Sequence, residues 1–296
     1  MSVKDLIDVD VQLDKGAMFA VEGQGKTIEA VTVNGYDGFG GVHDNLLWSS
    51  RDGMMTYTLH NKIIIESTKT RTQQILTESE VRLSTLARSP NERILAAAEG
   101  EKSRLGYAII YIIDAIQCKL LHKITFYRQG IQCMAFSSCG RYLIASSVTN
   151  EEPLVIFDVN SGGLCEGGTV MFTDECVNKI IPNPNIDTDV DFITVGQKGC
   201  FIIWKYDADK QRMLCIKPEM NQDLENTDFT CATYTPKLPA PFRSELVILG
   251  TADGAVVAVN PTPKDYENSN KLEWLEHGKK EFILGEAISS IIYRYS

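Results

Sequence analysis

The chain has 296 residues, of which 44% are hydrophobic, and a formal net charge of −10 at pH 7. This charge opposes binding to nucleic acid or to an anionic membrane surface, because both are negatively charged themselves. No apolar run approaches the ~20 residues of a membrane-spanning helix. Eight cysteines without a CxxC pair, together with an N-terminus that has no apolar signal region, indicate reduced thiols in the cytoplasm.

A turn-forming tetrapeptide recurs five times, each time between two short apolar runs. The copies are Ser50-Arg51-Asp52-Gly53, Ser89-Pro90-Asn91-Glu92, Ser137-Ser138-Cys139-Gly140, Pro182-Asn183-Pro184-Asn185 and Thr235-Pro236-Lys237-Leu238. A second mark closes an apolar run in each repeat, as Ile65-Glu66, Ile113-Asp114, Phe157-Asp158, Trp204-Lys205 and Val259-Asn260. Two signals that share a period of about 40–50 residues are typical of a WD-type β-propeller.

We therefore predict an all-β fold, a WD40-type β-propeller with five full blades of four strands. The strands are expected at 46–48, 54–58, 62–65 and 73–76 in blade one and at 83–87, 94–98, 107–113 and 120–126 in blade two. Blade three takes 132–136, 142–146, 154–157 and 169–172. Blade four takes 177–181, 191–195, 201–204 and 213–216, and blade five takes 229–234, 246–250, 255–259 and 272–275.

The ends of the chain complete the predicted domain plan. Residues 1–26 form an N-terminal tail, and 27–40 contain a latch strand and the entry segment. Residues 41–285 form the five blades, and 286–296 form the first strand of a sixth blade. A ring interrupted inside a blade leaves a sheet edge and a core face uncovered. We therefore expect the chain to be part of a longer protein.

A segment similar to a phosphate-binding loop and the histidines are the candidates for a chemical site, and the sequence argues against both. Ala20–Thr27 resembles a phosphate-binding P-loop with alanine in place of the first glycine, but an alternating, strand-like run follows where that motif requires a helix. The histidines share no metal-ligand spacing with one another or with cysteine. The sequence therefore predicts no catalytic residue, cofactor or metal, and a protein that is not an enzyme.

Long connections within an otherwise compact repeat are the predicted binding surfaces. Two of them, 99–106 and 147–153, replace the tight turn that blades four and five keep between their second and third strands, and 237–244 is a third candidate. The segment 99–106 carries both signs of charge and an apolar leucine, 147–153 carries two glutamates, and 237–244 carries basic and apolar side chains. The candidate partner-binding residues are Glu101, Lys102, Arg104, Glu151, Glu152, Pro239, Phe242 and Arg243.

The segment Val33-Asn34-Gly35-Tyr36-Asp37-Gly38, the first blade without Trp-Asp, and the blade-five run from Leu249 to Pro261 resemble the tandem-propeller WD-repeat proteins of cilia and flagella. They are also similar to the echinoderm microtubule-associated-like proteins. The resemblance implies two propellers of about seven blades each. Unlike typical WD repeats, this chain has no Gly-His pair before a blade, and only Asp114 and Asp158 keep the acidic mark. We therefore expect the buried Asp-His-Ser/Thr-Trp network to be absent and apolar packing to replace it.

The resemblance implies a structural, protein-docking component of the ciliary or flagellar axoneme, located in the cytoplasm and cytoskeleton. Its implied partners are tubulin or the doublet microtubule, inner-arm dynein and radial-spoke proteins. An alternative with the same fold is a general cytosolic WD-repeat adaptor, such as a ubiquitin-ligase substrate receptor, with no ciliary role. A P-loop-like nucleotide binder is a more remote alternative.

Overall fold

The computed structural model describes residues 22–23, 26–27, 45–49, 53–70, 72–149, 151–171, 177–185, 190–218, 224, 226–235, 246–261 and 273–281. In these residues every regular element is a β-strand, which confirms the predicted all-β class. Among them no helix is long and apolar enough to cross a membrane.

The strands from β3 to β22 form five four-stranded antiparallel sheets, each in chain order. Sheet I contains β3 (Leu46–Ser49), β4 (Met54–Leu59), β5 (Lys62–Ser67) and β6 (Gln73–Glu78). Sheet II contains β7 (Leu83–Arg88), β8 (Ile94–Glu99), β9 (Ile109–Asp114) and β10 (Lys119–Thr125). Sheet III contains β11 (Ile131–Phe136), β12 (Tyr142–Ser147), β13 (Leu154–Asp158) and β14 (Gly163–Val170). Sheet IV contains β15 (Val177–Pro182), β16 (Val190–Gly196), β17 (Phe201–Asp207) and β18 (Arg212–Ile216). Sheet V contains β19 (Phe229–Tyr234), β20 (Val247–Thr251), β21 (Ala255–Asn260) and β22 (Glu273–Glu281).

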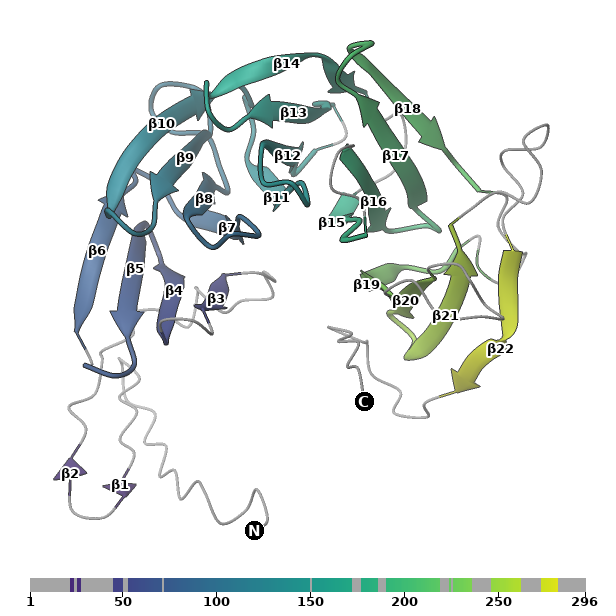
Figure 1. Cartoon of the computed structure of the whole chain (residues 1–296), viewed down its shortest axis with the longest axis horizontal. Helices are drawn as coiled ribbons and strands as arrows, with labels where there is room; N and C mark the ends of the chain where they lie inside the picture. The colour runs from purple at the N-terminus through teal and green to yellow at the C-terminus, as the bar shows by residue number, and fades with distance from the viewer. Residues whose placement is uncertain are drawn as a thin grey trace.

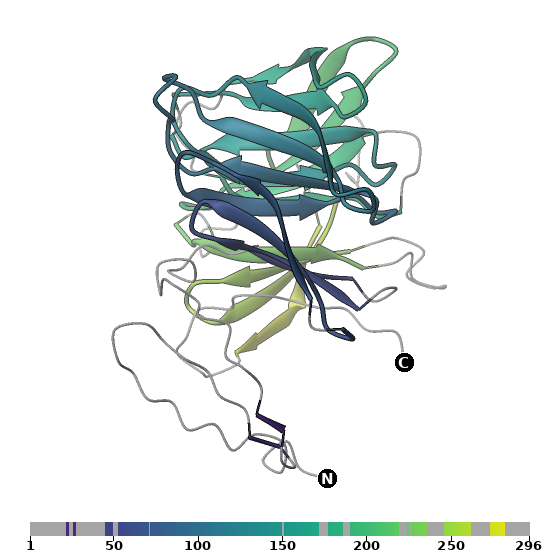
Figure 2. The same ribbon diagram turned by 90° about the vertical axis from the view of Figure 1, so that its left-hand side faces the viewer.

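The five sheets lie face to face along an arc. Figure 1 shows the first strand of each sheet on the inner side of the arc and the last strand on the outer side. The inner strands of neighbouring sheets contact one another, β7 with β11, β11 with β15 and β15 with β19. Figure 2, turned by 90°, shows the same sheets stacked one on the next. This radial arrangement of four-stranded sheets is a β-propeller, and its sheets are the five predicted blades.

The hydrophobic core is divided into layers between neighbouring sheets. Between sheets II and III, for example, Ile110 and Ile112 of β9 pack in one cluster with Leu143 and Phe157. Every residue of β9 is buried, because sheet II is covered on both faces, whereas residues of the outer strand β10 alternate between exposed and covered. The continuous apolar run of residues 109–113 is therefore a consequence of two-sided burial.

A buried polar residue lies where the inner strand of each blade ends. These residues are Ser49, Ser89, Ser137, Asn183 and Thr235, each at most 4% exposed. The Ser89 hydroxyl accepts the Ile94 N–H at 2.9 Å. The repeat predicted from sequence is confirmed, but its predicted start at residue 182 is displaced by one residue, because Pro182 belongs to β15. The predicted start at residue 50 lies outside the described residues. Turn-forming residue types mark the exposed part of the turn, whereas strand pairing determines which buried residue begins it.

The turn between the third and fourth strands is closed by a side chain that accepts a backbone N–H three residues later. The Asp114 carboxylate accepts the N–H of Gln117 at 2.8 Å, and the Asp158 carboxylate accepts that of Ser161 at 3.0 Å. In sheet IV the Asp207 carboxylate does the same for Lys210 at 3.1 Å. The prediction that only two blades keep an acidic mark is therefore wrong. β17 continues past Trp204-Lys205, so the acidic residue lies beyond the expected position.

Sheet IV contains one hydrogen bond of the Asp-His-Ser/Thr-Trp network that typical WD repeats form. The Trp204 indole donates a hydrogen bond to the Thr194 hydroxyl at 2.9 Å, and both side chains are buried. Sheet IV thus keeps the Trp–Thr bond, although the full network was expected to be absent and the blades to depend more on apolar packing. The Trp–Thr bond needs only two neighbouring strands. The register partner of Thr194 is Ile202, and Trp204 lies two residues further along β17, opposite Phe192.

Two outer strands differ in length from their prediction. β14 begins at Gly163 rather than at 169, because its pairing with β13 outweighs the poor strand propensity of its glycines. β22 extends to Glu281 rather than ending at 275, although it is largely polar, because it pairs with β21 as far as Ala255. The predicted latch strand beyond Thr27 and the predicted sixth-blade strand at 286–296 lie outside the described residues.

Candidate protein-interaction surface

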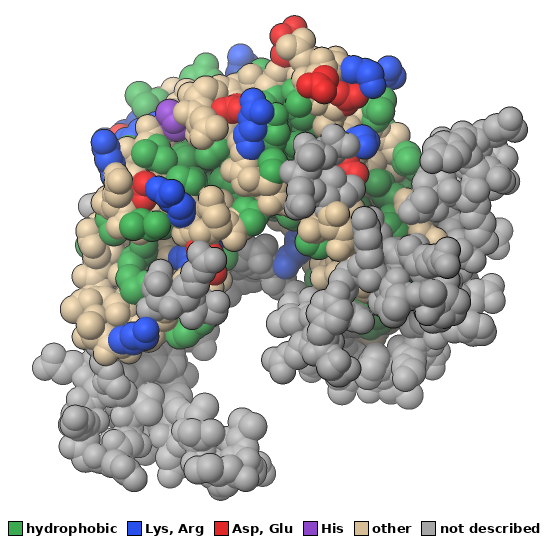
Figure 3. All heavy atoms as spheres, in the orientation of Figure 1, with side chains coloured by type: hydrophobic (Ala, Val, Ile, Leu, Met, Phe, Trp, Pro, Cys, Tyr) green, Lys and Arg blue, Asp and Glu red, His purple; other side chains and the backbone are tan. Residues whose placement is uncertain are grey.

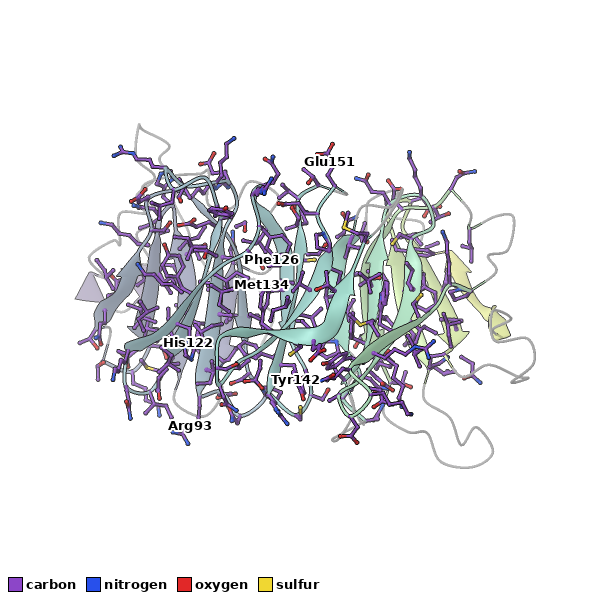
Figure 4. All side chains as sticks on the ribbon, turned by 90° about the horizontal axis from the view of Figure 1, so that it is seen from above. Arg93, His122, Phe126, Met134, Tyr142 and Glu151 are labelled. Carbon is purple, nitrogen blue, oxygen red and sulfur yellow. The ribbon has the colours of Figure 1, made fainter. Side chains whose placement is uncertain are left out.

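The candidate partner-binding residues fall into three segments. Glu101, Lys102 and Arg104 are exposed on the connection between β8 and β9. Glu151 is exposed and Glu152 is half-buried on the equivalent connection of sheet III. The candidates Pro239, Phe242 and Arg243 lie outside the described residues. Figure 4 shows Glu151 at one face of the molecule and Arg93, in the first turn of sheet II, at the opposite face.

The connection between β8 and β9 is a structured turn. The hydroxyl of Ser103, 5% exposed, donates to the carbonyl of Tyr107 at 2.9 Å, and the Ser103 N–H donates to the same carbonyl at 2.9 Å. The Gly106 N–H returns to the Ser103 carbonyl at 2.9 Å, which requires the positive φ of 84° that glycine adopts readily. The turn therefore holds Arg104 and Leu105 at its tip by bonds within its own backbone.

A fully buried carboxylate lies beneath this turn. Glu99 is 0% exposed and accepts hydrogen bonds from the Ser79 hydroxyl at 2.5 Å, the Tyr111 hydroxyl at 2.9 Å and the Ile109 N–H at 2.9 Å. Burial, reinforced by the hydrogen bond to Glu99 and its charge, raises the pKa of Tyr111 to about 12. Both hydroxyls therefore remain donors at neutral pH, and a carboxylate with three donors is stable in this interior. Sequence reasoning missed Glu99, because a glutamate after an apolar strand reads as the start of a polar loop.

Glu152 fixes the neighbouring connection rather than pointing freely to solvent. Its carboxylate accepts the backbone N–H groups of Arg128 at 2.5 Å and Gln129 at 3.1 Å. It also accepts the Ser147 hydroxyl at 2.7 Å. The Glu152 side chain thus joins the connection at 148–153 to the segment that enters sheet III. Glu151 has its side chain on the surface, where it remains a candidate contact residue.

The two connections meet at a close backbone contact. A Cβ added to Gly130 would lie 1.7 Å from the carbonyl oxygen of Gly100, so only glycine fits at this position. The carbonyl of Gly130 in turn accepts the Val148 N–H at 3.0 Å and the Ser147 hydroxyl at 3.0 Å. Gly130 therefore links the connection that carries the sheet II candidates to the connection that carries those of sheet III.

Other chemical sites find little support in the described residues. The strand β1 (Glu22–Gly23) pairs with β2 (Lys26–Thr27), so Lys26 and Thr27 lie in a β-hairpin where a P-loop would begin its helix. In the part of the chain that the structure describes, no group of three or more His, Cys, Asp or Glu side chains could hold a metal ion.

The face seen in Figure 3 carries no single-sign patch over the described residues. Lys and Arg side chains lie interspersed with Asp and Glu and with apolar side chains. The mixed charges of the described residues on this face therefore do not favour binding of a highly charged polymer.

Comparison with known proteins supports the resemblance that the sequence suggested. No protein-family model matches the chain. Cilia- and flagella-associated protein 52 of Chlamydomonas reinhardtii is 28% identical over 239 residues, which cover 78% of this chain and 36% of that protein. The chain resembles the cilia- and flagella-associated WD-repeat proteins. Centriole proteome protein 16 of the same alga is 24% identical over 153 residues, 42% of this chain and 7% of that protein.

A human protein and two solved structures extend the comparison. WD repeat-containing protein 90 of Homo sapiens is 29% identical over 112 residues, 38% of this chain and 6% of that protein. This chain thus spans about a third of the length of the first curated relative and less than a tenth of the other two. The structure of U3-55K aligns with a TM-score of 0.48 at 14% identity, covering 78% of this chain and 79% of that one. The crystal structure of RRP9 WD40 repeats aligns with a TM-score of 0.41, also at 14% identity, covering 78% of each chain.

Proposed function

We propose that this protein is a structural component of the ciliary or flagellar axoneme, a WD-repeat scaffold that docks other proteins. The observation that carries the proposal is the similarity to cilia- and flagella-associated protein 52, which extends over 78% of the chain. The propeller fold is consistent with it, because such folds display many loops on a rigid framework. The partners proposed are doublet-microtubule tubulin, inner-arm dynein or radial-spoke proteins.

The chemistry of the surface favours local docking over bulk electrostatic attraction. A chain with a net charge of −10 is repelled by acidic surfaces at long range. The connection at 100–108 offers Lys102 and Arg104 next to apolar Leu105, all exposed. Such a mixture supports short-range contacts that combine apolar burial with a few ion pairs. We propose no catalytic role for any residue of this surface.

The proposal is tested by locating the tagged full-length protein and by replacing its loops. We expect the tagged protein in cilia, and we expect replacement of residues 101–106 by a short Gly-Ser turn to leave it folded but to weaken its incorporation into axonemes. Glu99 and Gly100 stay in place, because Glu99 belongs to the buried network beneath the loop. A parallel replacement of 237–244 tests the other predicted segment. A protein distributed through the cytoplasm and absent from cilia would favour the general adaptor instead.

A further inference from the structure

Leu105 is the most exposed large apolar side chain in the described part of the chain. It is 69% exposed and lies at the tip of the turn between β8 and β9. Tyr107, on the same turn, is 40% exposed, and Val148 on the neighbouring connection is 37% exposed. A lone exposed leucine is ordinary on a protein surface. This one is joined by further apolar side chains on a surface built from two adjacent blades.

The turn presents Leu105 in a defined position. Ser103 closes it through two bonds to the carbonyl of Tyr107, and the Leu105 N–H itself donates to the Ser103 hydroxyl at 3.3 Å. Glu99 anchors the next strand through the Ile109 N–H at 2.9 Å. A side chain held in this way loses little conformational freedom when it is buried by a partner, which favours tight association.

Charged side chains surround the tip without neutralising one another. Within the described residues, Lys102 and Arg104 form no ion pair, so both cations are available to a partner. Arg128 is exposed on the adjoining segment, where its backbone N–H is held by Glu152. An arginine beside an apolar anchor is a typical composition for the centre of a protein–protein interface.

We propose that the surface formed by 101–107, 128–129, 148–149 and 151 inserts Leu105 into an apolar pocket of a folded protein partner, with a carboxylate of that partner paired to Arg104. A linear peptide is a poorer fit, because peptide ligands require a groove or a sheet edge on the receptor, whereas this turn is convex. The inference rests on the proposed docking function and specifies the surface and the class of partner.

The experiment measures binding of the full-length protein to axonemes isolated from cells that lack it. We expect Leu105→Ser and Arg104→Glu each to weaken binding by about tenfold or more. The matched control is Ile116→Ser, because Ile116 is 67% exposed and lies in the turn between β9 and β10, at the other end of the same sheet. This control should leave the affinity unchanged. Circular dichroism establishes that all three variants are folded.

A cyclised peptide of residues 100–108 provides a second readout, because the turn is closed by its own hydrogen bonds. It should compete with the full-length protein for axonemes, and the same peptide carrying Leu105→Ser should not. Unchanged binding by both variants, or a loss caused by Ile116→Ser alone, would overturn this inference while leaving the proposed function standing. Failure of the wild-type protein to bind axonemes would overturn both.

Discussion

At the residue scale, glycine is required where the outer strands of two blades approach most closely. Gly167 in β14 has a φ of 66°, and a Cβ added there would lie 1.7 Å from the carbonyl oxygen of Gln211. A nearby bond joins the same two blades, since the Tyr206 hydroxyl donates to the carbonyl of Glu166 at 2.9 Å. Gly106 also has a positive φ, of 84°, but nothing lies within 4 Å of its added Cβ.

These two glycines allow backbone strain to be separated from steric exclusion. We expect Gly106→Ala to lower the free energy of unfolding by about 1–2 kcal/mol, the cost of a left-handed conformation for alanine. We expect Gly167→Ala to lower it further, because the strands β14 and β18 must also separate. Urea denaturation of both variants measures the difference. Equal destabilisation would mean that the backbone around Gly167 relaxes freely.

Buried tyrosines make the fold sensitive to alkaline pH. Burial and the adjacent carboxylates raise the pKa of Tyr57, beside Glu66, and of Tyr111, beside Glu99, to about 12. Burial and neighbouring charges also raise the pKa of Tyr206 to about 12. The stability that these neutral phenols contribute is complete below the reference pKa of 10.0 and is lost as the pH rises through about 12.

We therefore expect the melting temperature to fall steeply between pH 10 and pH 12. Each tyrosine contributes at most about 1.4 kcal/mol per pH unit in this window. In Tyr111→Phe the dependence on pH should be shallower, although the variant is less stable at pH 7 because Glu99 loses a donor. Thermal scans across the alkaline range test this, and an unaltered slope in the variant would contradict it.

At the element scale, sheet IV combines apolar stacking with a polar bond. The rings of Phe192 and Trp204 are stacked with centroids 6.1 Å apart, and the Trp204 indole donates to Thr194 on the adjoining strand. The bond joins β16 to β17 inside the layer shared with sheet III. A buried hydrogen bond in this setting contributes about 0.5–1.5 kcal/mol net, with a larger cost if only one partner is removed.

A double-mutant cycle of Trp204→Phe and Thr194→Val measures this bond. We expect each single variant to be destabilised by more than 1 kcal/mol and the two effects to be less than additive, with a coupling energy of about 0.5–1.5 kcal/mol. The free energies come from equilibrium urea unfolding. Strict additivity would show that the Trp–Thr contact contributes only through packing.

At the scale of the whole molecule, sheet I has an exposed face whose equivalent in sheet II is buried against the neighbouring sheet. Leu46 and Leu86 both lie three residues before a buried turn serine, Ser49 and Ser89. Leu86 is 1% exposed because sheet I covers it, whereas Leu46 is 51% exposed. Trp48, on the same side of β3 as Leu46, is 57% exposed. Sheet I therefore carries the side chains of a blade-to-blade interface on a face that is open to solvent.

We expect residues 1–296, expressed as they stand, to self-associate through this face. The double variant Leu46→Gln/Trp48→Gln should shift the protein toward monomer, because each exposed apolar side chain that is removed reduces the area available for burial. Leu214→Gln, a change to an exposed leucine of the outer strand β18, should have little effect. Sedimentation velocity over a concentration series measures the oligomeric state, and a wild type that stays monomeric throughout would refute the expectation.

Much of the architecture could be predicted because short-range physics determines it. Alternating or fully apolar runs such as 109–113 indicate strands, and serine, proline, asparagine and glycine mark the turns between them. The errors of prediction concern the register of the strands and the positions of the turns. The displaced turn start at residue 182 and the misplaced mark at Lys205 arise because the sequence pattern was interpreted without knowledge of the strand partners. A one-residue or two-residue shift is invisible in composition but changes which residue closes a turn.

The interaction surface, too, could be predicted only in part from the sequence. The sequence by itself determined that the connections at 99–106 and 147–153 would be longer than a tight turn, because polar and turn-forming residues interrupt the apolar runs there. It could not indicate that the two connections approach each other, since the link between them runs from Gly100 to Gly130 and on to Val148, and Glu152 holds the segment at 128–129. The turn that presents Leu105 is closed by bonds between residues close in sequence. Only the tertiary structure decided that Glu99 is buried and that Glu152 supports a loop, because their partners, Ser79 and Tyr111 for Glu99 and Arg128 for Glu152, come from separate parts of the chain.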